Sequence, residues 1–332
     1  MGSSISSICS ALLIAGLLSS AQLFAAATPS PALLVLNKAD SSLAIVDPAT
    51  RTVVGRVPTG EAPHELAVSD DGKLAFASNY GARIPGHTLS VIDLEARKEI
   101  HRVDLSPMGR PHKLAYHDGR LYFTAELAKL IGRYDPSTNK VDWLLGTGQN
   151  KTHMILFTRD GSKAFTSNID SNTVTAISTS GDWNETVIPV GKGPEGIDIS
   201  PDGNEVWSAS SRDGGISIID PATDTVKQTL HTGTKRSNRL KFTPDGKHVL
   251  VSDMGGNELL VIDASTGQVT KRLHIGRQPE GILVVSGENA PRAYVAVSGD
   301  NAIAILDLNT MEITGHIATG REPDGMAWAV RK

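Results

Sequence analysis

The chain has 332 residues and a formal net charge of −4, which argues against nucleic-acid binding through bulk positive charge. Its only cysteine is Cys9, so a domain that begins after the N-terminal segment has neither disulfides nor a thiol nucleophile. Composition leaves room for a locally charged site, and the order of the predicted elements indicates where to look for it.

The N-terminal segment has the composition of a cleaved signal peptide. Residues 1–27 contain no charged side chain, include the apolar run 11–18 and end in three alanines. The apolar run is too short for a comfortable membrane span. We therefore expect a signal peptide over 1–27, a single domain over 28–332 without a membrane span, and a periplasmic or secreted location.

One phrase recurs along the rest of the chain. It begins P-x-G, continues with alternating apolar residues and ends in a D-G turn, as in 194–203. Its seven copies are 41 to 48 residues apart and begin at Pro63, Pro111, Thr152, Pro194, Ser237, Pro279 and Pro323. A period of this length indicates a repeat architecture in which each unit buries its core against its neighbours.

Each copy contains four short strand signals. In the copy that starts at Pro194 they are 196–200, 205–210, 216–220 and 225–230, which are bounded by turn residues. Four strands per unit and seven units predict an all-β, seven-bladed propeller with four antiparallel strands per blade. Residues 33–37 and 323–330 each supply part of one blade. We therefore expect the N- and C-terminal strands to pair and close the ring.

The strand sequences 74–79, 249–253 and 293–297, each followed by a second apolar strand that ends in aspartate, resemble the YVTN-type repeats of exported YncE-like β-propellers. The resemblance covers about residues 33–330. It implies the propeller fold and export from the cytoplasm. It implies little about activity, because the family includes ligand binders, surface proteins, nucleic-acid binders and lactonase-like or cofactor-handling enzymes.

The start of each repeat copy carries the candidate functional residues. In a propeller the first strand of each blade lines the central channel, so these positions gather at one mouth. The second residues of the copies are, in order, His64, His112, His153, Glu195, Asn238, Glu280 and Asp324. The third residue is glycine in three copies, but in the other four it is Glu65, Lys113, Met154 or Arg239. A bulky residue where a repeat has glycine is the kind of departure that marks a functional site.

Three consecutive copies offer imidazole, which predicts a metal site formed by His64, His112 and His153. Imidazole nitrogen binds Zn, Cu or Fe, and three such ligands leave a coordination position for water or substrate. Glu65 is a candidate fourth ligand. The alternative is a channel whose polar side chains bind only water.

Cations near the same mouth predict a small anionic ligand or a protein partner. Arg110 and similar residues precede most copies, and the enlarged loop 79–88 adds Arg83 and His87. The other expected ligand contacts are Glu195, Asn238, Glu280 and Asp324. Aromatic side chains for stacking are few, so nucleic acid is the less favoured ligand.

An enzyme is the alternative function. Glu65 with His112 has the residue types of an acid–base pair, and Lys113 and Arg239 would stabilise negative charge that develops on a carboxylate or lactone substrate. The reaction would be that of a metal- or acid/base-dependent lactonase, hydrolase or lyase. The sequence leaves both functions open.

Overall fold

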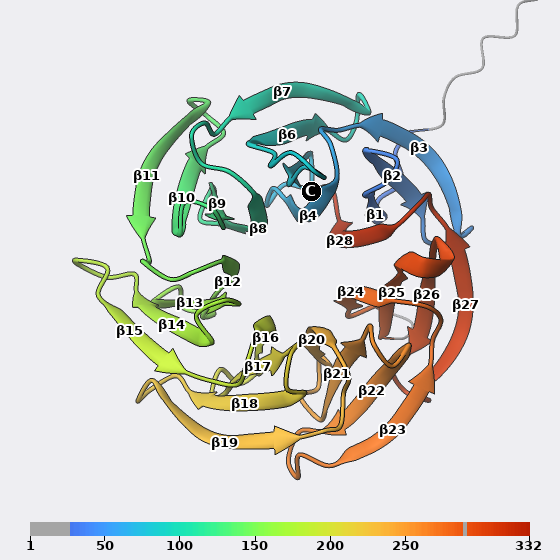
Figure 1. Cartoon of the computed structure of the whole chain (residues 1–332). Coiled ribbons are helices and arrows are strands. Elements are labelled where there is room, and N and C mark those ends of the chain that lie inside the picture. The colour runs from blue at the N-terminus through green and yellow to red at the C-terminus, as the bar shows by residue number, and fades with distance from the viewer. Residues whose placement is uncertain (1–26, 288–290) are drawn as a thin grey trace, which may run out of the picture.

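Seven four-stranded antiparallel sheets are arranged in a ring around a central axis in the computed structural model, which describes residues 27–287 and 291–332 (Figure 1). The predicted seven-bladed all-β propeller is therefore confirmed. Of the signal peptide expected over 1–27, all but the last residue lies outside the described residues. Within the described ranges, no helix is long and apolar enough to cross a membrane.

The blades follow one another in chain order, and blade 1 combines both ends of the chain. Blade 1 contains β28 (Pro323–Ala329), β1 (Ala32–Asn37), β2 (Ser42–Asp47) and β3 (Thr52–Pro58). Blade 2 contains β4 (Pro63–Val68), β5 (Leu74–Asn79), β6 (Thr88–Asp93) and β7 (Lys98–Asp104). Blade 3 contains β8 (Pro111–His117), β9 (Arg120–Ala125), β10 (Leu130–Asp135) and β11 (Lys140–Gly146).

The other four blades have the same arrangement. Blade 4 contains β12 (Thr152–Phe157), β13 (Lys163–Asn168), β14 (Thr173–Ser178) and β15 (Glu185–Pro189). Blade 5 contains β16 (Pro194–Ile199), β17 (Val206–Ser210), β18 (Gly215–Asp220) and β19 (Thr225–His231). Blade 6 contains β20 (Ser237–Phe242), β21 (His248–Asp253), β22 (Glu258–Asp263) and β23 (Val269–His274). Blade 7 contains β24 (Pro279–Val285), β25 (Arg292–Val297), the 3-10 helix η1 (Ser298–Asp300), β26 (Ala302–Asp307) and β27 (Glu312–Ala318).

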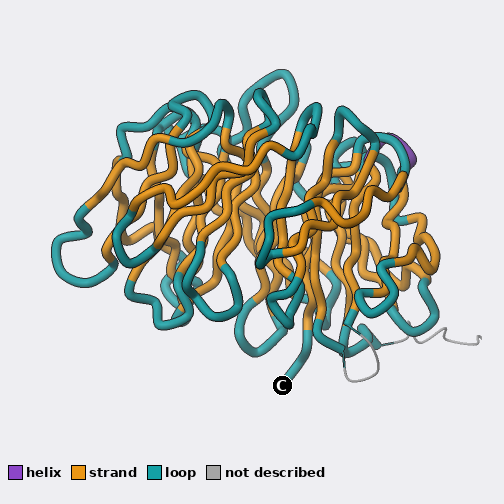
Figure 2. The backbone as a smooth tube through the Cα atoms, turned by 90° about the horizontal axis from the view of Figure 1, so that it is seen from below, coloured by secondary structure: helices purple, strands orange, loops and turns teal. Residues whose placement is uncertain are grey.

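The ring closes as the sequence predicts, by pairing of the first and last strands. β1 and β28 are antiparallel, with Leu33 opposite Trp328 and Leu34 opposite Ala327. The strands run between two layers of loops, and the C-terminus lies in the layer opposite the one that contains η1 (Figure 2). The channel mouth considered below lies in the η1 layer, where the first strand of each blade begins.

Apolar side chains fill the spaces between neighbouring blades. Between blades 5 and 6 the wholly buried Trp207 packs with Phe242 at a ring-centroid distance of 5.5 Å, within a cluster that includes Ile216, Leu240 and Val251. Each inter-blade space is thus a separate small core, which is how a ring of about 300 residues avoids the size limit of a single core.

A β-bulge at the start of each first strand shapes the channel mouth. On β4 the ladder advances from Pro63 to Leu66 while β5 advances only from Asn79 to Ala77, so one residue on β4 is extra. Successive residues of a regular strand face opposite sides, and a bulge breaks that alternation. Neighbouring positions such as His64 and Glu65 are therefore both drawn into the mouth, where neither is exposed.

The recurrent glycine of the repeat has a steric cause. A Cβ on Gly325 would lie 2.2 Å from the carbonyl oxygen of His64, and a Cβ on Gly196 would lie 2.8 Å from that of Asn238. In these copies the first strand lies against the backbone of the next blade. Where a bulky residue replaces the glycine, its side chain needs room that these copies do not have.

Candidate metal centre at the channel mouth

A cavity of about 210 Å³ lies at the mouth, lined by residues of all seven blades or of the loops that join them. Its lining residues are Lys38, His64, Tyr80, His112, Lys151, His153, Glu195, Arg236, Asn238, Arg239, Met254, Glu280 and Asp324. All seven side chains at the second position of the repeat line this cavity, so the copies converge there as the sequence suggested.

Two of the three predicted metal-binding histidines lie together with a carboxylate. The rings of His112 and His153 are stacked with their centroids 3.6 Å apart, and Glu126 Oε1 is 2.5 Å from His153 Nδ1. One potential ligand atom from each of His112, Glu126 and His153 lies within 4.8 Å of the others. All three residues are buried, so this group could hold a metal ion away from bulk water.

One ring nitrogen of each histidine is available for a ligand. Among the described residues, His112 Nδ1 and His153 Nε2 are buried and have no hydrogen-bond partner. Burial, reinforced by the nearby His153 and Arg239, holds the pKa of His112 well below its usual value. His112 is therefore neutral at pH 7, and a neutral imidazole nitrogen is a metal ligand.

Glu126 orients His153 through its side chain. Burial raises the pKa of Glu126, but hydrogen bonds from His153 and from the hydroxyl of Tyr80, at 2.5 Å, outweigh it and keep the pKa below the usual value. An ionised carboxylate on Nδ1 leaves the lone pair of His153 on Nε2. The Tyr80 pKa is raised by burial and by Glu126, so the phenol stays protonated and donates.

His64 lies beside this cluster but is not part of it. Its ring is 5.6 Å from that of His112 and 4.4 Å from that of Tyr80, and its Nδ1 is 2.8 Å from the carbonyl oxygen of Ala62. Burial lowers the pKa of His64, with Asp324 offsetting part of the effect. Glu126 thus occupies the place beside His112 and His153 that the sequence assigned to His64.

Glu65 is held between two cations. Its Oε2 is 2.8 Å from Lys113 Nζ, and its Oε1 is 2.7 Å from Arg239 Nη2. Burial by itself raises the pKa of Glu65, but the combined effect of Lys113 and Arg239 is larger and lowers this pKa to about 2. A carboxylate with this pKa and with both oxygens paired accepts a proton poorly near pH 7. The geometry therefore fits a counter-ion better than the general base considered from the sequence.

A second charged group forms the opposite side of the cavity. Lys38 forms an ion pair with Glu280 and lies 3.4 Å from Asp324, and the hydroxyl of Ser298 donates to Glu280 at 2.7 Å. Burial and the neighbouring Asp324 raise the pKa of Glu280 to about 7 in spite of Lys38. The positive charge of Lys38 is thus shared by two acidic groups.

The remaining polar residues complete this network. Asn238 donates to Glu195 at 2.8 Å and accepts from Arg239 at 3.3 Å. Arg239, predicted to bind substrate charge, is therefore neutralised by Glu65 and further surrounded by acceptors. Its pKa is raised because these acidic neighbours outweigh the effect of burial.

The enlarged loop 79–88 brings Tyr80 to the cavity, whereas Arg83 and His87 are exposed and outside its lining. Arg110 holds this loop: its guanidinium lies 4.5 Å from the Tyr80 ring centroid and donates to the carbonyl oxygens of Gly81 and Ala82. The insertion therefore contributes to the cavity through its aromatic residue, not through the cation and imidazole selected from the sequence.

Sequence reasoning missed Glu126 and Lys38, and it gave Tyr80 no role in a metal site. All three directly follow the second strand of a blade, where the other four blades have Ile169, Ser211, Met254 and Ser298. A carboxylate, a lysine and a tyrosine among apolar residues and serines depart from the repeat as clearly as the bulky third-position residues do. Alignment of this position would have found them.

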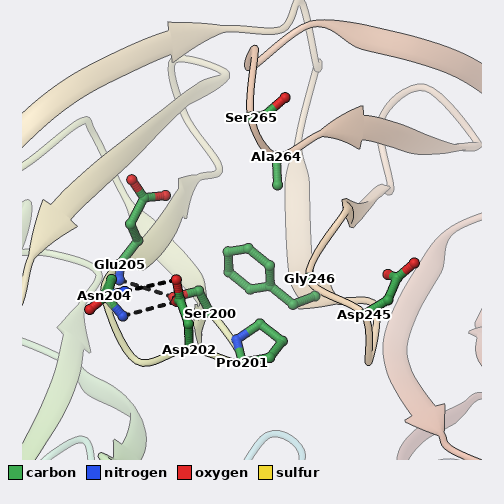
Figure 3. Close-up of a pocket in the computed structure, with 10 residues that line it drawn as sticks. Ser200, Pro201, Asp202, Asn204, Glu205, Asp245, Gly246, Ala264 and Ser265 are labelled. Atoms are coloured by element: carbon green, nitrogen blue, oxygen red, sulfur yellow. Dashed lines mark hydrogen bonds between the residues drawn. The ribbon is translucent and has the colours of Figure 1, made fainter.

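The opposite face has its own hollow of about 420 Å³, formed by turns of blades 5 and 6 (Figure 3). There Asp202 accepts hydrogen bonds from Ser200 and Asn204, and Asp245 accepts one from Thr243. These contacts stabilise tight turns and recur in other copies, as with Asp160 and Ser162 in blade 4. The hollow is a product of the scaffold.

The sequence and the fold both match known propellers. A family described as YNCE-like beta-propeller matches residues 3–177, more than half of the chain. No curated protein matches it. At 15% identity and a TM-score of 0.75, 91% of this chain aligns with 100% of a functionally unknown protein from Desulfotomaculum acetoxidans.

Two further solved structures share the fold. A putative 6-phosphogluconolactonase from Bacteroides uniformis is 15% identical, with a TM-score of 0.74 over 90% of this chain and 99% of that one. Hydrazine synthase from Kuenenia stuttgartiensis is 20% identical, with a TM-score of 0.66 over 81% of this chain and 92% of that one. At these identities the likeness shows the fold alone.

Proposed function

This chain belongs to the YncE-like β-propeller family, and we propose that it binds a divalent transition metal at the channel mouth through His112 and His153, with Glu126 orienting His153. One observation carries the proposal. Two stacked, buried imidazoles present ring nitrogens without partners, and one of the rings is oriented by a buried carboxylate. Unpartnered buried nitrogens are costly unless a ligand occupies them.

The donor set agrees with the metals expected from the sequence. Two imidazoles suit Zn²⁺, Cu²⁺ and Fe²⁺, and they leave coordination positions for water or a co-ligand. A metal there would lie within a cavity of about 210 Å³, large enough for water or a small co-ligand. The proposed setting is the periplasmic or secreted location expected from residues 1–27. A partner other than the metal would bind through the cations around the cavity.

Competition with a chelating dye tests the proposal. Metal-free protein should take up about one equivalent of Zn²⁺, and the variant His112→Ala/His153→Ala should lose that binding while keeping the circular dichroism of the wild type. His231→Ala/His274→Ala, on the exposed outer strands β19 and β23, is the matched control and should bind as the wild type does. Retained stoichiometric binding in the first double variant would refute the assignment.

An acid–base enzyme is the second candidate, and the contact between Glu126 and His153 favours it. A carboxylate on Nδ1 with Nε2 unpartnered is the arrangement of an oriented general base. The base would then be His153, not Glu65. A lactone hydrolysis activity that persists in metal-free protein and disappears in His153→Ala would support this candidate, and absence of such activity would remove it.

A further inference from the structure

A second hollow adjoins the metal centre on the same face, between the loops of blades 3 and 4. Its volume is about 600 Å³, and its walls include Arg110, Lys129 and Lys151 as well as Leu127. Tyr80 and Lys151 line both this hollow and the mouth cavity, and Glu126 belongs to both the hollow and the metal cluster. A molecule bound here would therefore lie next to the proposed metal.

In blades 1 and 7, the arginine of the preceding loop is neutralised within the repeat. Arg277 pairs with Asp300 through its side chain at 2.6 Å, and Arg321 pairs with Asp40 in the same way at 2.6 Å. In both blades the aspartate is the third residue after the second strand, and it also accepts a hydrogen bond from the backbone of the arginine. The repeat thus supplies a carboxylate for these cations.

Blades 3 and 4 lack that carboxylate. The third residue after the second strand is Ala128 in blade 3 and Ser171 in blade 4. The cations of the preceding loops, Arg110 and Lys151, also stand one residue later, directly before the first strand. Their charges are left without the aspartate that blades 1, 5 and 7 have at this position.

The carboxylates that do line the hollow are already engaged. Glu126 accepts hydrogen bonds from Tyr80 and His153, and Asp170 forms an ion pair with Arg212. Among the described residues, Arg110, Lys129 and Lys151 form no salt bridge, and Arg110 donates to the carbonyl oxygens of Gly81 and Ala82. The hollow therefore has a net positive charge with donors facing solvent.

An apolar side chain completes this surface. Leu127 is 58% exposed, an unusual state for a large apolar residue, and it packs beside Gly109 at the edge of the hollow. We propose that the hollow binds a small organic anion, with its carboxylate or phosphate toward Lys129 and Lys151 and its apolar part against Leu127. This inference goes beyond metal binding and does not depend on it, because the cations are outside the metal cluster.

Calorimetric titration of the full, metal-free protein with phenyl phosphate and with benzoate tests the proposal. The wild type should bind at least one of these probes, and the preferred probe tells a phosphate ligand from a carboxylate ligand. Lys151→Ala should weaken that binding at least fivefold. Lys192→Ala, in a blade that keeps its aspartate as Asp213, should change it less than twofold.

A third titration tests the apolar contact, since phenyl phosphate should bind more tightly than inorganic phosphate. Equal losses in Lys151→Ala and Lys192→Ala would overturn the proposal, because they would indicate diffuse charge. Binding of neither probe, binding only after zinc is added, or equal affinity for phenyl and inorganic phosphate would also overturn it. These outcomes leave the zinc titration of the metal centre unaffected, so the two proposals fail separately.

Discussion

The imidazole rings of His112 and His153 stack at 3.6 Å although they belong to different blades. A hydroxyl fixes this relationship: Thr124 Oγ1 accepts from the backbone N–H of Lys113 and donates to the carbonyl oxygen of His153 at 2.7 Å. The two imidazoles are therefore positioned by the packing of blades 3 and 4.

Replacement of Glu126 by glutamine should weaken zinc binding without unfolding the ring. The substitution keeps the shape of the side chain but removes the charge that orients His153 and contributes to the cluster. Loss of such a contact typically costs 10- to 100-fold in metal affinity. The measurement is a zinc titration against a chelator of known affinity.

The matched control for that variant is Glu99→Gln, which removes a carboxylate paired with Arg102 on the outer strand β7. It should bind zinc as the wild type does. Equal affinity in Glu126→Gln and Glu99→Gln would show that Glu126 has no part in the site.

Tyr80→Phe should lower zinc affinity by less than Glu126→Gln does. The variant removes the hydroxyl that donates to Glu126 at 2.5 Å but leaves the ring against His64 and the carboxylate on His153. The same titration checks the order of the two effects. A larger loss in Tyr80→Phe than in Glu126→Gln would mean that the phenol, not the carboxylate, organises the cluster.

Glu65→Gln should destabilise the protein strongly, because it leaves the buried Arg239 without its counter-ion and Lys113 without its partner. Breaking a buried ion pair from one side costs about 3–5 kcal/mol. Denaturant unfolding at pH 7 measures the loss. Since the pKa of Glu65 is depressed to about 2, its contribution is present above about pH 4.5 and is lost as the pH falls toward 2.

The double variant Glu65→Gln/Arg239→Met distinguishes a counter-ion from a catalytic base. Removal of both charges should recover much of the stability lost in Glu65→Gln. If the loss of stability in the double variant equals the sum of the losses in Glu65→Gln and Arg239→Met, the two charges do not interact as their distance indicates.

The pH dependence of stability should carry the signature of Glu280. Its pKa is raised to about 7 by burial and by Asp324, so between about pH 4.5 and 7 the folded state keeps a proton that the unfolded state releases. The contribution of this group to stability therefore falls as the pH rises through that window. Glu280→Gln removes the titration. From pH 5 to pH 7 the stability of this variant should therefore fall less than that of the wild type, by a difference on the order of 1 kcal/mol. Parallel pH curves for the two proteins would contradict this.

The repeat allowed the fold to be predicted almost completely. The seven start positions read from the sequence, Pro63 to Pro323, are the first residues of β4, β8, β12, β16, β20, β24 and β28, because the turn residues and the apolar alternation recur in each copy. Closure by β1 and β28 followed from the incomplete terminal units.

The site was only partly predictable. His112 and His153 stood at a fixed repeat position that topology brings to the mouth, so the sequence found them. Glu126 comes from a loop after a second strand, and its contact with His153 depends on how two blades pack, which no spacing records. The pairing of Glu65 with Arg239 joins residues 174 positions apart in blades 2 and 6, so it also needed the closed ring.

Anomalous diffraction at the zinc absorption edge from crystals of the zinc-loaded protein tests the central claim most directly. We predict one strong peak within about 2.0–2.2 Å of a ring nitrogen of both His112 and His153, with Glu126 beside it. A crystal that contains zinc but shows no peak at this cluster, or a peak only at exposed histidines such as His231, would contradict the account.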